Sequence, residues 1–256
     1  MNGRNLLIGL AIKYLGQWHD MIRAIQTKEP LDEDEINGYL KLIKCNVLTI
    51  LDPEYPQYLR QYTFPPLVLF YYGDISLIKD LSNVIGVVGS RNPDPIIVPE
   101  AYEVIYKLAK DFTIISGLAK GIDGLSHKAA IDAGGKTIAV LPNGIEFCYP
   151  SENERLYEVI KKNHLVISEY PFHCPPEKDN FYQRNRLIVF FSRALFIPCG
   201  NIRSGTSITA RLACDYNHPV YCFPSGNIHG SLCNLLIKDG AMLVQDVEDI
   251  LMFEKK

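Results

Sequence analysis

The 256-residue sequence lacks long hydrophobic runs, and no apolar stretch approaches the roughly 20 residues that a membrane-spanning helix needs. The apolar start of the chain is interrupted by Gly9, Lys13 and Tyr14, and no small-residue cleavage site follows it. It therefore predicts a helix that faces the core and not a signal peptide. The net charge of −3 gives no global attraction for nucleic acid, so any such binding must depend on a local patch.

The sequence has no CxxC pair among its seven cysteines, which stand at positions 45, 148, 174, 199, 214, 222 and 233. An odd number without paired spacing argues against a disulfide framework and against structural zinc. Several of these cysteines lie in apolar, strand-like segments, as Cys199 and Cys222 do. We therefore expect reduced thiols in a cytoplasmic protein, with no metal and no cofactor.

Two nucleotide-binding motifs are also missing. The absence of GxxxxGK[ST] excludes a P-loop ATPase, and the absence of GxGxxG disfavours NAD binding. The loop nearest to that second motif reads GVVGSR at 86–91, with both glycines inside the expected strand. The next expected strand ends in Ser116 and Gly117, without the acidic residue that would hold a ribose.

A hydrolase motif of the form GxSxG is absent as well. Asp123 and His127 are four residues apart on one helix face, with Ser116 and Ser126 nearby. These residues are of the types that form a Ser/His/Asp catalytic site in hydrolases. Without the strained turn that exposes a nucleophile, a hydrogen-bonded support beneath a loop is the favoured interpretation.

From Val84 onward, short apolar runs alternate with helical patterns. This alternation predicts a mostly parallel sheet with helices on both faces, which is an α/β fold. We expect strands near 84–89, 112–116, 136–141, 164–168, 194–198, 219–223 and 241–244, and helices near 98–110, 122–133, 151–162, 178–191, 205–216, 231–239 and 246–253. Residues 1–44 predict a small helical module. Residues 45–80, with a strand at 68–74, predict an extension or linker packed on the main domain, which spans 45–256.

Three expected loops combine glycine, serine or threonine with the start of a helix, an arrangement that favours anions. The first two carry a cation each, Arg91 and Lys120, and the third begins at Ser204. Residues 171–211 hold six cations against two acids, including the run Arg184-Asn185-Arg186. Because the carboxyl ends of parallel strands share one sheet edge, these groups predict a site for a chain of phosphates.

Seven blocks of this sequence resemble the DNA-processing protein A (DprA/Smf) family of bacterial transformation and recombination proteins. They are VVGSRNPD at 87–94, SGLAKGIDGLSHKAA at 116–130, NGIEFCYP at 143–150, ISEYP at 167–171, QRNRLI at 183–188, SGTSITARLA at 204–213 and CNLLIKDGA at 233–241. The resemblance covers about residues 50–245, in the family's order.

This resemblance implies an extended Rossmann-like domain that binds single-stranded DNA, forms homodimers, helps to load the RecA recombinase and is not an enzyme. By resemblance the DNA-binding residues are Gly89, Ser90, Arg91, Ser116, Gly117, Lys120, Gly121, Arg184, Asn185, Arg186, Ser204, Gly205 and Thr206.

The sequence departs from the family pattern in four ways. Lys120 replaces an arginine, Phe190 and Phe191 stand where small residues are usual, and Pro142 and Glu146 replace Gly and Asp. A C-terminal winged-helix module is expected to be missing.

Two alternative functions stay open. In the first, the chain would be a nucleotide-binding or nucleotide-processing protein, with Asp123, His127 or Glu169 as catalytic groups. In the second, it would be a recombination scaffold that acts mainly through protein contacts.

Overall fold

A computed structural model describes residues 2–172, 174–227 and 229–255 of the chain. Within these residues a single sheet has the strand order β1-β2-β6-β5-β4-β3-β7-β8-β9. The strands are β1 (Asn46–Thr49), β2 (Val68–Gly73), β3 (Val84–Val87), β4 (Thr113–Ser116), β5 (Thr137–Val140), β6 (Leu165–Ser168), β7 (Ala194–Ile197), β8 (Val220–Cys222) and β9 (Met242–Leu243). Neighbours from β6 to β9 are parallel, whereas β1, β2 and β6 pair antiparallel. The expected α/β fold with a mostly parallel sheet is confirmed.

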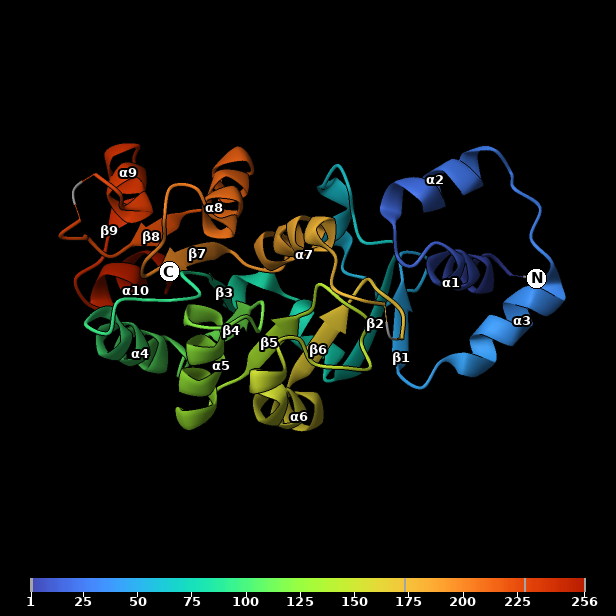
Figure 1. Ribbon diagram of the computed structural model, residues 1–256, viewed down its shortest axis with the longest axis horizontal. Helices are drawn as coiled ribbons and strands as arrows, with labels where there is room; N and C mark the ends of the chain where they lie inside the picture. Colours follow the sequence, from blue (N-terminus) through green and yellow to red (C-terminus); the bar gives the residue numbers. More distant parts are fainter. Residues whose placement is uncertain (1, 173, 228, 256) are drawn as a thin grey trace.

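The helices cover both faces of this sheet, as the alternation predicts (Figure 1). They are α1 (Gly3–Lys13), α2 (Trp18–Gln26), α3 (Glu33–Leu42), α4 (Ile97–Leu108), α5 (Ile122–Asp132), α6 (Glu154–Asn163), α7 (Lys178–Phe190), α8 (Gly205–Asp215), α9 (Leu232–Lys238) and α10 (Glu248–Glu254). In Figure 1, α7, α8 and α9 lie above the sheet, and α4, α5 and α6 lie below it. No described helix has both the length and the apolar character needed to cross a membrane.

The central strands are short and apolar because both of their faces are covered. Every residue of β3, β5, β6 and β7 is buried. On one face Ile115 and Ile197 pack with Leu187 of α7, and on the other face Phe196 packs with Ile105 of α4. The sheet therefore places the carboxyl ends of its central strands at one protected edge.

The segment 45–80 extends the sheet. It supplies β1 and β2, and β2 pairs antiparallel with β6. The helices upstream of it share a hydrophobic cluster with this end of the sheet, in which Leu7 and Leu10 of α1 lie with Phe70 and Val166. A domain boundary at 44/45 stays a prediction.

The two phenylalanines at the end of α7 are fully buried, away from the edge formed by the strand ends. Phe190 stacks on Tyr62 of the extension with ring centroids 3.7 Å apart, and it meets Tyr216 edge-on. Both Phe190 and Phe191 belong to the core on that face of the sheet. Bulky residues at these positions thus dock the 45–80 segment onto α7.

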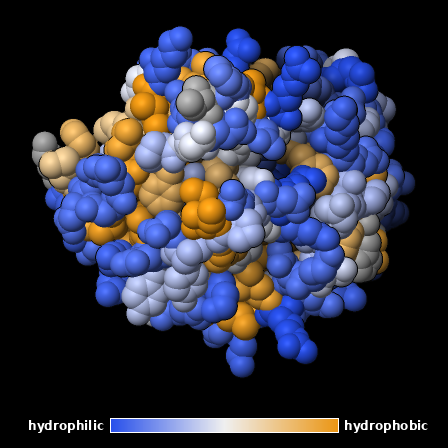
Figure 2. Space-filling model, turned by 60° about the vertical axis from the view of Figure 1, so that its left-hand side comes forward, coloured by the Kyte–Doolittle hydropathy of each residue, from blue (hydrophilic) through white to orange (hydrophobic). Residues whose placement is uncertain are grey.

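The surface at the β9 end of the molecule is mostly hydrophilic, with separate hydrophobic patches (Figure 2). Leu243 and Met252 are exposed apolar side chains of β9 and α10. Scattered apolar residues of this kind are normal on a folded surface and carry no assignment by themselves.

Candidate functional site

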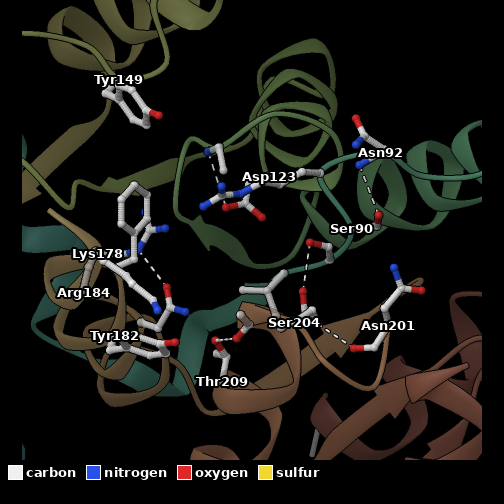
Figure 3. Close-up of a pocket in the computed structure, with 18 residues that line it drawn as sticks. Ser90, Asn92, Asp123, Tyr149, Lys178, Tyr182, Arg184, Asn201, Ser204 and Thr209 are labelled. Atoms are coloured by element: carbon white, nitrogen blue, oxygen red, sulfur yellow. Dashed lines mark hydrogen bonds between the residues drawn. The ribbon is translucent and has the colours of Figure 1, made fainter. Parts of the chain in front are cut away.

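A cavity of about 570 Å³ opens at the carboxyl ends of the central strands (Figure 3). It lies next to β3 and β7, where the chain changes direction across the sheet, which is the place where open α/β sheets bind ligands. The residues that line it are Val88, Gly89, Ser90, Arg91, Asn92, Ala119, Asp123, Tyr149, Lys178, Phe181, Tyr182, Arg184, Asn185, Asn201, Ser204, Gly205, Thr206 and Thr209.

The loop that follows β3 is fixed to its neighbours through the backbone. The Ser90 amide donates to the carbonyl of Cys199 at 3.0 Å, and the Thr206 hydroxyl donates to the carbonyl of Gly89 at 3.0 Å. A Cβ at Gly89 would lie 2.6 Å from the side chain of Ile122, so only glycine fits there. The exposed Arg91 leaves this loop toward α7, with its guanidinium carbon 5.2 Å from the centre of the Phe181 ring.

The loop that follows β4 is joined to the first loop. The Ile122 amide donates to the carbonyl of Ser90 at 3.1 Å. Gly121 has φ +73°, and a Cβ there would lie 2.3 Å from the same carbonyl oxygen, which explains the glycine. Ser116 is buried and its hydroxyl donates to the carbonyl of Val87 at 2.6 Å. Ser116 and Gly121 therefore build the loops and do not line the cavity.

Arg184 is buried and holds two strand ends together. Its Nη1 donates to the carbonyls of Gly117 and Val140, the second at 2.7 Å, and its Nε donates to Asn185 Oδ1 at 2.9 Å. A Cβ at Gly117 would lie 2.3 Å from Nη1, so the glycine makes room for the guanidinium. Burial lowers the pKa of Arg184 to about 10, and the nearby Asp123 carboxylate opposes that shift.

Arg186 does not line the cavity, in contrast to the expectation that Arg184 and Arg186 together track phosphates. Residues two apart on a helix point in nearly opposite directions. Arg186 Nη2 instead donates to Glu169 Oε1 at 2.7 Å, and both side chains are buried. Burial raises the pKa of Glu169, and the Arg186 charge opposes that shift.

The third expected loop opens α8 toward the cavity. Ser204 and Ser207 form a reciprocal capping box, and the Ser204 hydroxyl donates to the carbonyl of Asn201 at 2.6 Å. Gly205 is exposed and has no atom nearer than 4.0 Å to an added Cβ. Gly205 and Thr206 open α8, so their backbone amides have no partner within the helix. Amides and the positive end of a helix dipole favour an anion at this place.

The cations of the site are divided between a rim and a floor. We define the rim as Arg91, Lys120 and Lys178, which are all exposed, and the floor as Gly117, Asp123 and Arg184. Lys120 lines a smaller adjoining cavity that shares Arg91, Ala119, Tyr149 and Phe181 with the larger one, and it pairs with Glu152.

Several lining residues were not predicted to form the site. Phe181, Tyr182 and Lys178 belong to the cation-rich segment 171–211, and Phe181 lies one helical turn before Arg184. Asn92 and Asn201 flank predicted loop residues. Tyr149 and Thr209 lie within two of the family-like blocks, 143–150 and 204–213, but no local pattern shows that their side chains reach this edge.

The groups proposed for catalysis are not assembled around a substrate position. His127 is buried, and its Nδ1 lies 2.7 Å from Thr137 Oγ1. Burial lowers the pKa of His127 to about 3, so it stays neutral. Asp123 accepts a hydrogen bond from the Ala119 amide of the loop before it. Asp123 thus supports the loop and also lines the cavity, whereas His127 contacts β5 and does not line the cavity.

The parallel sheet, covered by helices on both faces, defines a Rossmann-like α/β protein. The chain belongs to the DNA recombination-mediator protein A (DprA/Smf) family, whose model matches residues 46–255. It is 38% identical over 205 residues to DNA processing protein DprA of Streptococcus pneumoniae, covering 79% of this chain and 72% of that protein. It is 37% identical to DNA processing protein DprA of Bacillus subtilis, covering 80% of this chain and 70% of that protein. The chain spans about half the length of Protein Smf of Synechocystis, at 52%.

Solved structures agree with this assignment. The structure of DNA processing protein A from Streptococcus pneumoniae superposes with a TM-score of 0.78 at 32% identity, covering 98% of this chain and 93% of that chain. DNA processing protein A from Helicobacter pylori superposes with a TM-score of 0.73 at 28% identity, covering 82% of this chain and 95% of that chain. The second structure was described for the unique single-stranded DNA binding mode of the Helicobacter pylori protein.

Proposed function

We propose that the cavity at the strand ends binds single-stranded DNA through its phosphates. The observation that carries this proposal is the combination of an exposed cationic rim with the first amides of α8, which have no partner within the helix. A relative with the same fold, from Helicobacter pylori, has a single-stranded DNA binding mode, which supports the same ligand class here.

The rim and the floor have different tasks in this mechanism. Arg91 and Lys178 supply full charges to successive phosphates, and Lys120 adds a charge that Glu152 partly neutralises. The amides of Gly205 and Thr206 fix the register of the strand. Arg184 shapes the floor, because its Nη1 and Nε donate hydrogen bonds to other groups of the protein. Phosphate contacts of this kind position a strand without reading its sequence.

In the cell we expect the bound strand to be handed to recombination. The family description, recombination mediator, supports a non-catalytic role in which this protein protects single-stranded DNA and helps to load RecA. Action as a homodimer in the cytoplasm, during uptake or repair of DNA, completes this proposal.

A small nucleotide is the second candidate ligand, because a cavity of about 570 Å³ falls in the size range of small-molecule sites. A rise in thermal midpoint with a mononucleotide, but not with an oligonucleotide, would favour it.

The deciding experiment is fluorescence anisotropy of a labelled dT oligonucleotide of about 10 nucleotides, a typical single-strand site size. Salt is varied from about 50 to 200 mM, and a matching duplex is the control. We expect the single strand to bind more tightly than the duplex. If all three rim cations contact phosphates, the log–log salt slope is about −2, at about −0.7 per phosphate. Absence of binding at low salt would overturn the proposal.

A further inference from the structure

Asp123 is an unexpected residue in a site for phosphates. Among the described residues that line the cavity it is the one acidic side chain, and it is only 6% exposed. Figure 3 shows its carboxylate facing the centre of the cavity. A carboxylate repels phosphate, so the strand must present something other than a phosphate to this part of the floor.

The carboxylate accepts a hydrogen bond from the Ala119 amide at 3.4 Å, and the nearby Gly117 amide also favours its charged form. No described lysine or arginine forms an ion pair with it. Arg184, the strongest positive influence on it, directs its Nη1 and Nε to Gly117, Val140 and Asn185. Burial raises the pKa of Asp123, and the charge of Arg184 and the neighbouring amides oppose that shift.

Buried carboxylates are normally paired or hydrogen-bonded, so the cavity side of Asp123 calls for donors from a ligand. A divalent cation does not fit, because the described residues contain no cluster of three metal-binding side chains. An ionised carboxylate is an acceptor only and suits a group with two adjacent N–H donors.

The walls around Asp123 suit the flat faces of a base. Tyr149 and Tyr182 line the cavity and are each 42% exposed, which leaves ring surface for stacking. Asn92 and Asn201 add amides that can donate to or accept from a polar edge.

We infer that Asp123 forms a base-reading subsite in the proposed DNA pocket and selects guanine, whose N1–H and 2-amino group lie side by side. Thymine offers one N–H between two carbonyls, and adenine and cytosine offer a single amino group on this edge. The inference rests on the proposed binding of single-stranded DNA and adds a base preference to it.

The test compares dT oligonucleotides of about 10 nucleotides that carry one central dT, dG or deoxyinosine, in the anisotropy assay at fixed salt. Deoxyinosine keeps N1–H and lacks the 2-amino group. We expect the dG oligonucleotide to bind about 10-fold more tightly than all-dT, the size of a modest bidentate base contact. Deoxyinosine offers one N–H, as thymine does, so it should lose most of that gain and bind within about 3-fold of all-dT.

Asp123→Asn should abolish these differences, so that the dG, deoxyinosine and dT oligonucleotides bind the variant with equal affinity, whatever that affinity is. The matched control is Asp179→Asn, an exposed acid at the start of α7 that loses the same charge outside the cavity and should keep the dG preference. If Asp123→Asn does not fold, the dG, deoxyinosine and dT series on the unaltered protein decides the question.

The outcomes separate the two proposals. Failure of every oligonucleotide to bind would overturn DNA binding itself. Salt-sensitive binding with equal affinity for dT, dG and deoxyinosine would overturn only the base-reading role of Asp123. If an oligouridine RNA gains affinity over its deoxy counterpart and Asp123→Asn removes that gain, the carboxylate reads a ribose hydroxyl, and the guanine inference is wrong.

Discussion

The rim and the floor of the cavity use similar side chains for opposite purposes. Arg91 on the rim is exposed and free to meet a ligand, whereas Arg184 on the floor is buried and bonded to two carbonyls of its own chain. Arg186, only two residues away, is committed to Glu169. A cluster of arginines in a sequence therefore does not reveal which of the guanidinium groups are exposed and available to bind a ligand.

The largest effect is expected when the ion-pair partner of a buried arginine is removed. Glu169→Ala should lower the free energy of unfolding by about 3–5 kcal/mol, because it leaves the buried Arg186 charge unpaired. Urea denaturation measures the change.

The double variant Glu169→Leu with Arg186→Met should recover most of that loss, since it removes both charges. Glu152→Ala is the control on the rim, because the exposed pair with Lys120 contributes less than about 1 kcal/mol. Equal effects of Glu152→Ala and Glu169→Ala would contradict the distinction between rim and floor.

A smaller loss is expected at Gly117. Its added Cβ would lie 2.3 Å from Arg184 Nη1, so Gly117→Ala should lower the free energy of unfolding by up to about 3 kcal/mol through overpacking. Gly205→Ala is the matched control in the main cavity, where the nearest atom is 4.0 Å away, and it should leave stability unchanged or slightly raised. Chemical denaturation of both variants gives the comparison, which fails if the two alanines have equal effects.

The buried His127 should make the stability of the folded chain depend on pH. Its pKa is about 3 in the folded chain against 6.5 in the unfolded chain, so the unfolded chain takes up the proton first as the pH falls below 6.5. Stability is thus lost with decreasing pH, by about 2 kcal/mol at pH 5 relative to neutral pH. Denaturation curves of His127→Gln should lack this part of the pH dependence. A variant with the same pH slope as the unaltered protein would show that another group is responsible.

On the rim the expected effect is on binding alone. Arg91→Ala should weaken dT binding about 10-fold and make the log–log salt slope less negative by about 0.7, one phosphate contact. Its thermal midpoint should stay unchanged, because the side chain is exposed. Lys120→Ala should have a smaller effect on affinity, since Glu152 already pairs with that lysine. An unchanged salt slope for Arg91→Ala would remove Arg91 from the phosphate path.

Much of this fold could be predicted from the sequence because its strands are continuous apolar runs. The run at 84–89 becomes β3, and the pattern at 178–191 becomes α7, which begins at Lys178. The antiparallel pairing of β1 and β2 was not predictable, because the prolines between them hide the strand at 46–49. Which edge of a sheet receives such a pair depends on long-range packing.

The composition of the site could be predicted better than its geometry. Eight of the 13 expected DNA-binding residues line the main cavity, and Gly117 and Lys120 line the adjoining one. The direction of Arg186 was missed because the pairing with Glu169 joins α7 to the end of β6, a contact that no local pattern records. Tyr149 was missed for the same reason.

The loops of the cavity are close in space but far apart in the sequence. The hydrogen bond from Thr206 to Gly89 spans 117 residues, and the bond from Arg184 to Gly117 spans 67. Closing such large loops costs chain entropy, which the rest of the fold must offset. The cavity is therefore complete only when these distant parts of the chain are folded together. A ligand at a free concentration of 100 times its Kd would raise the free energy of unfolding by about 2.7 kcal/mol. A bound strand would therefore shift the folding equilibrium of the whole molecule toward the native state.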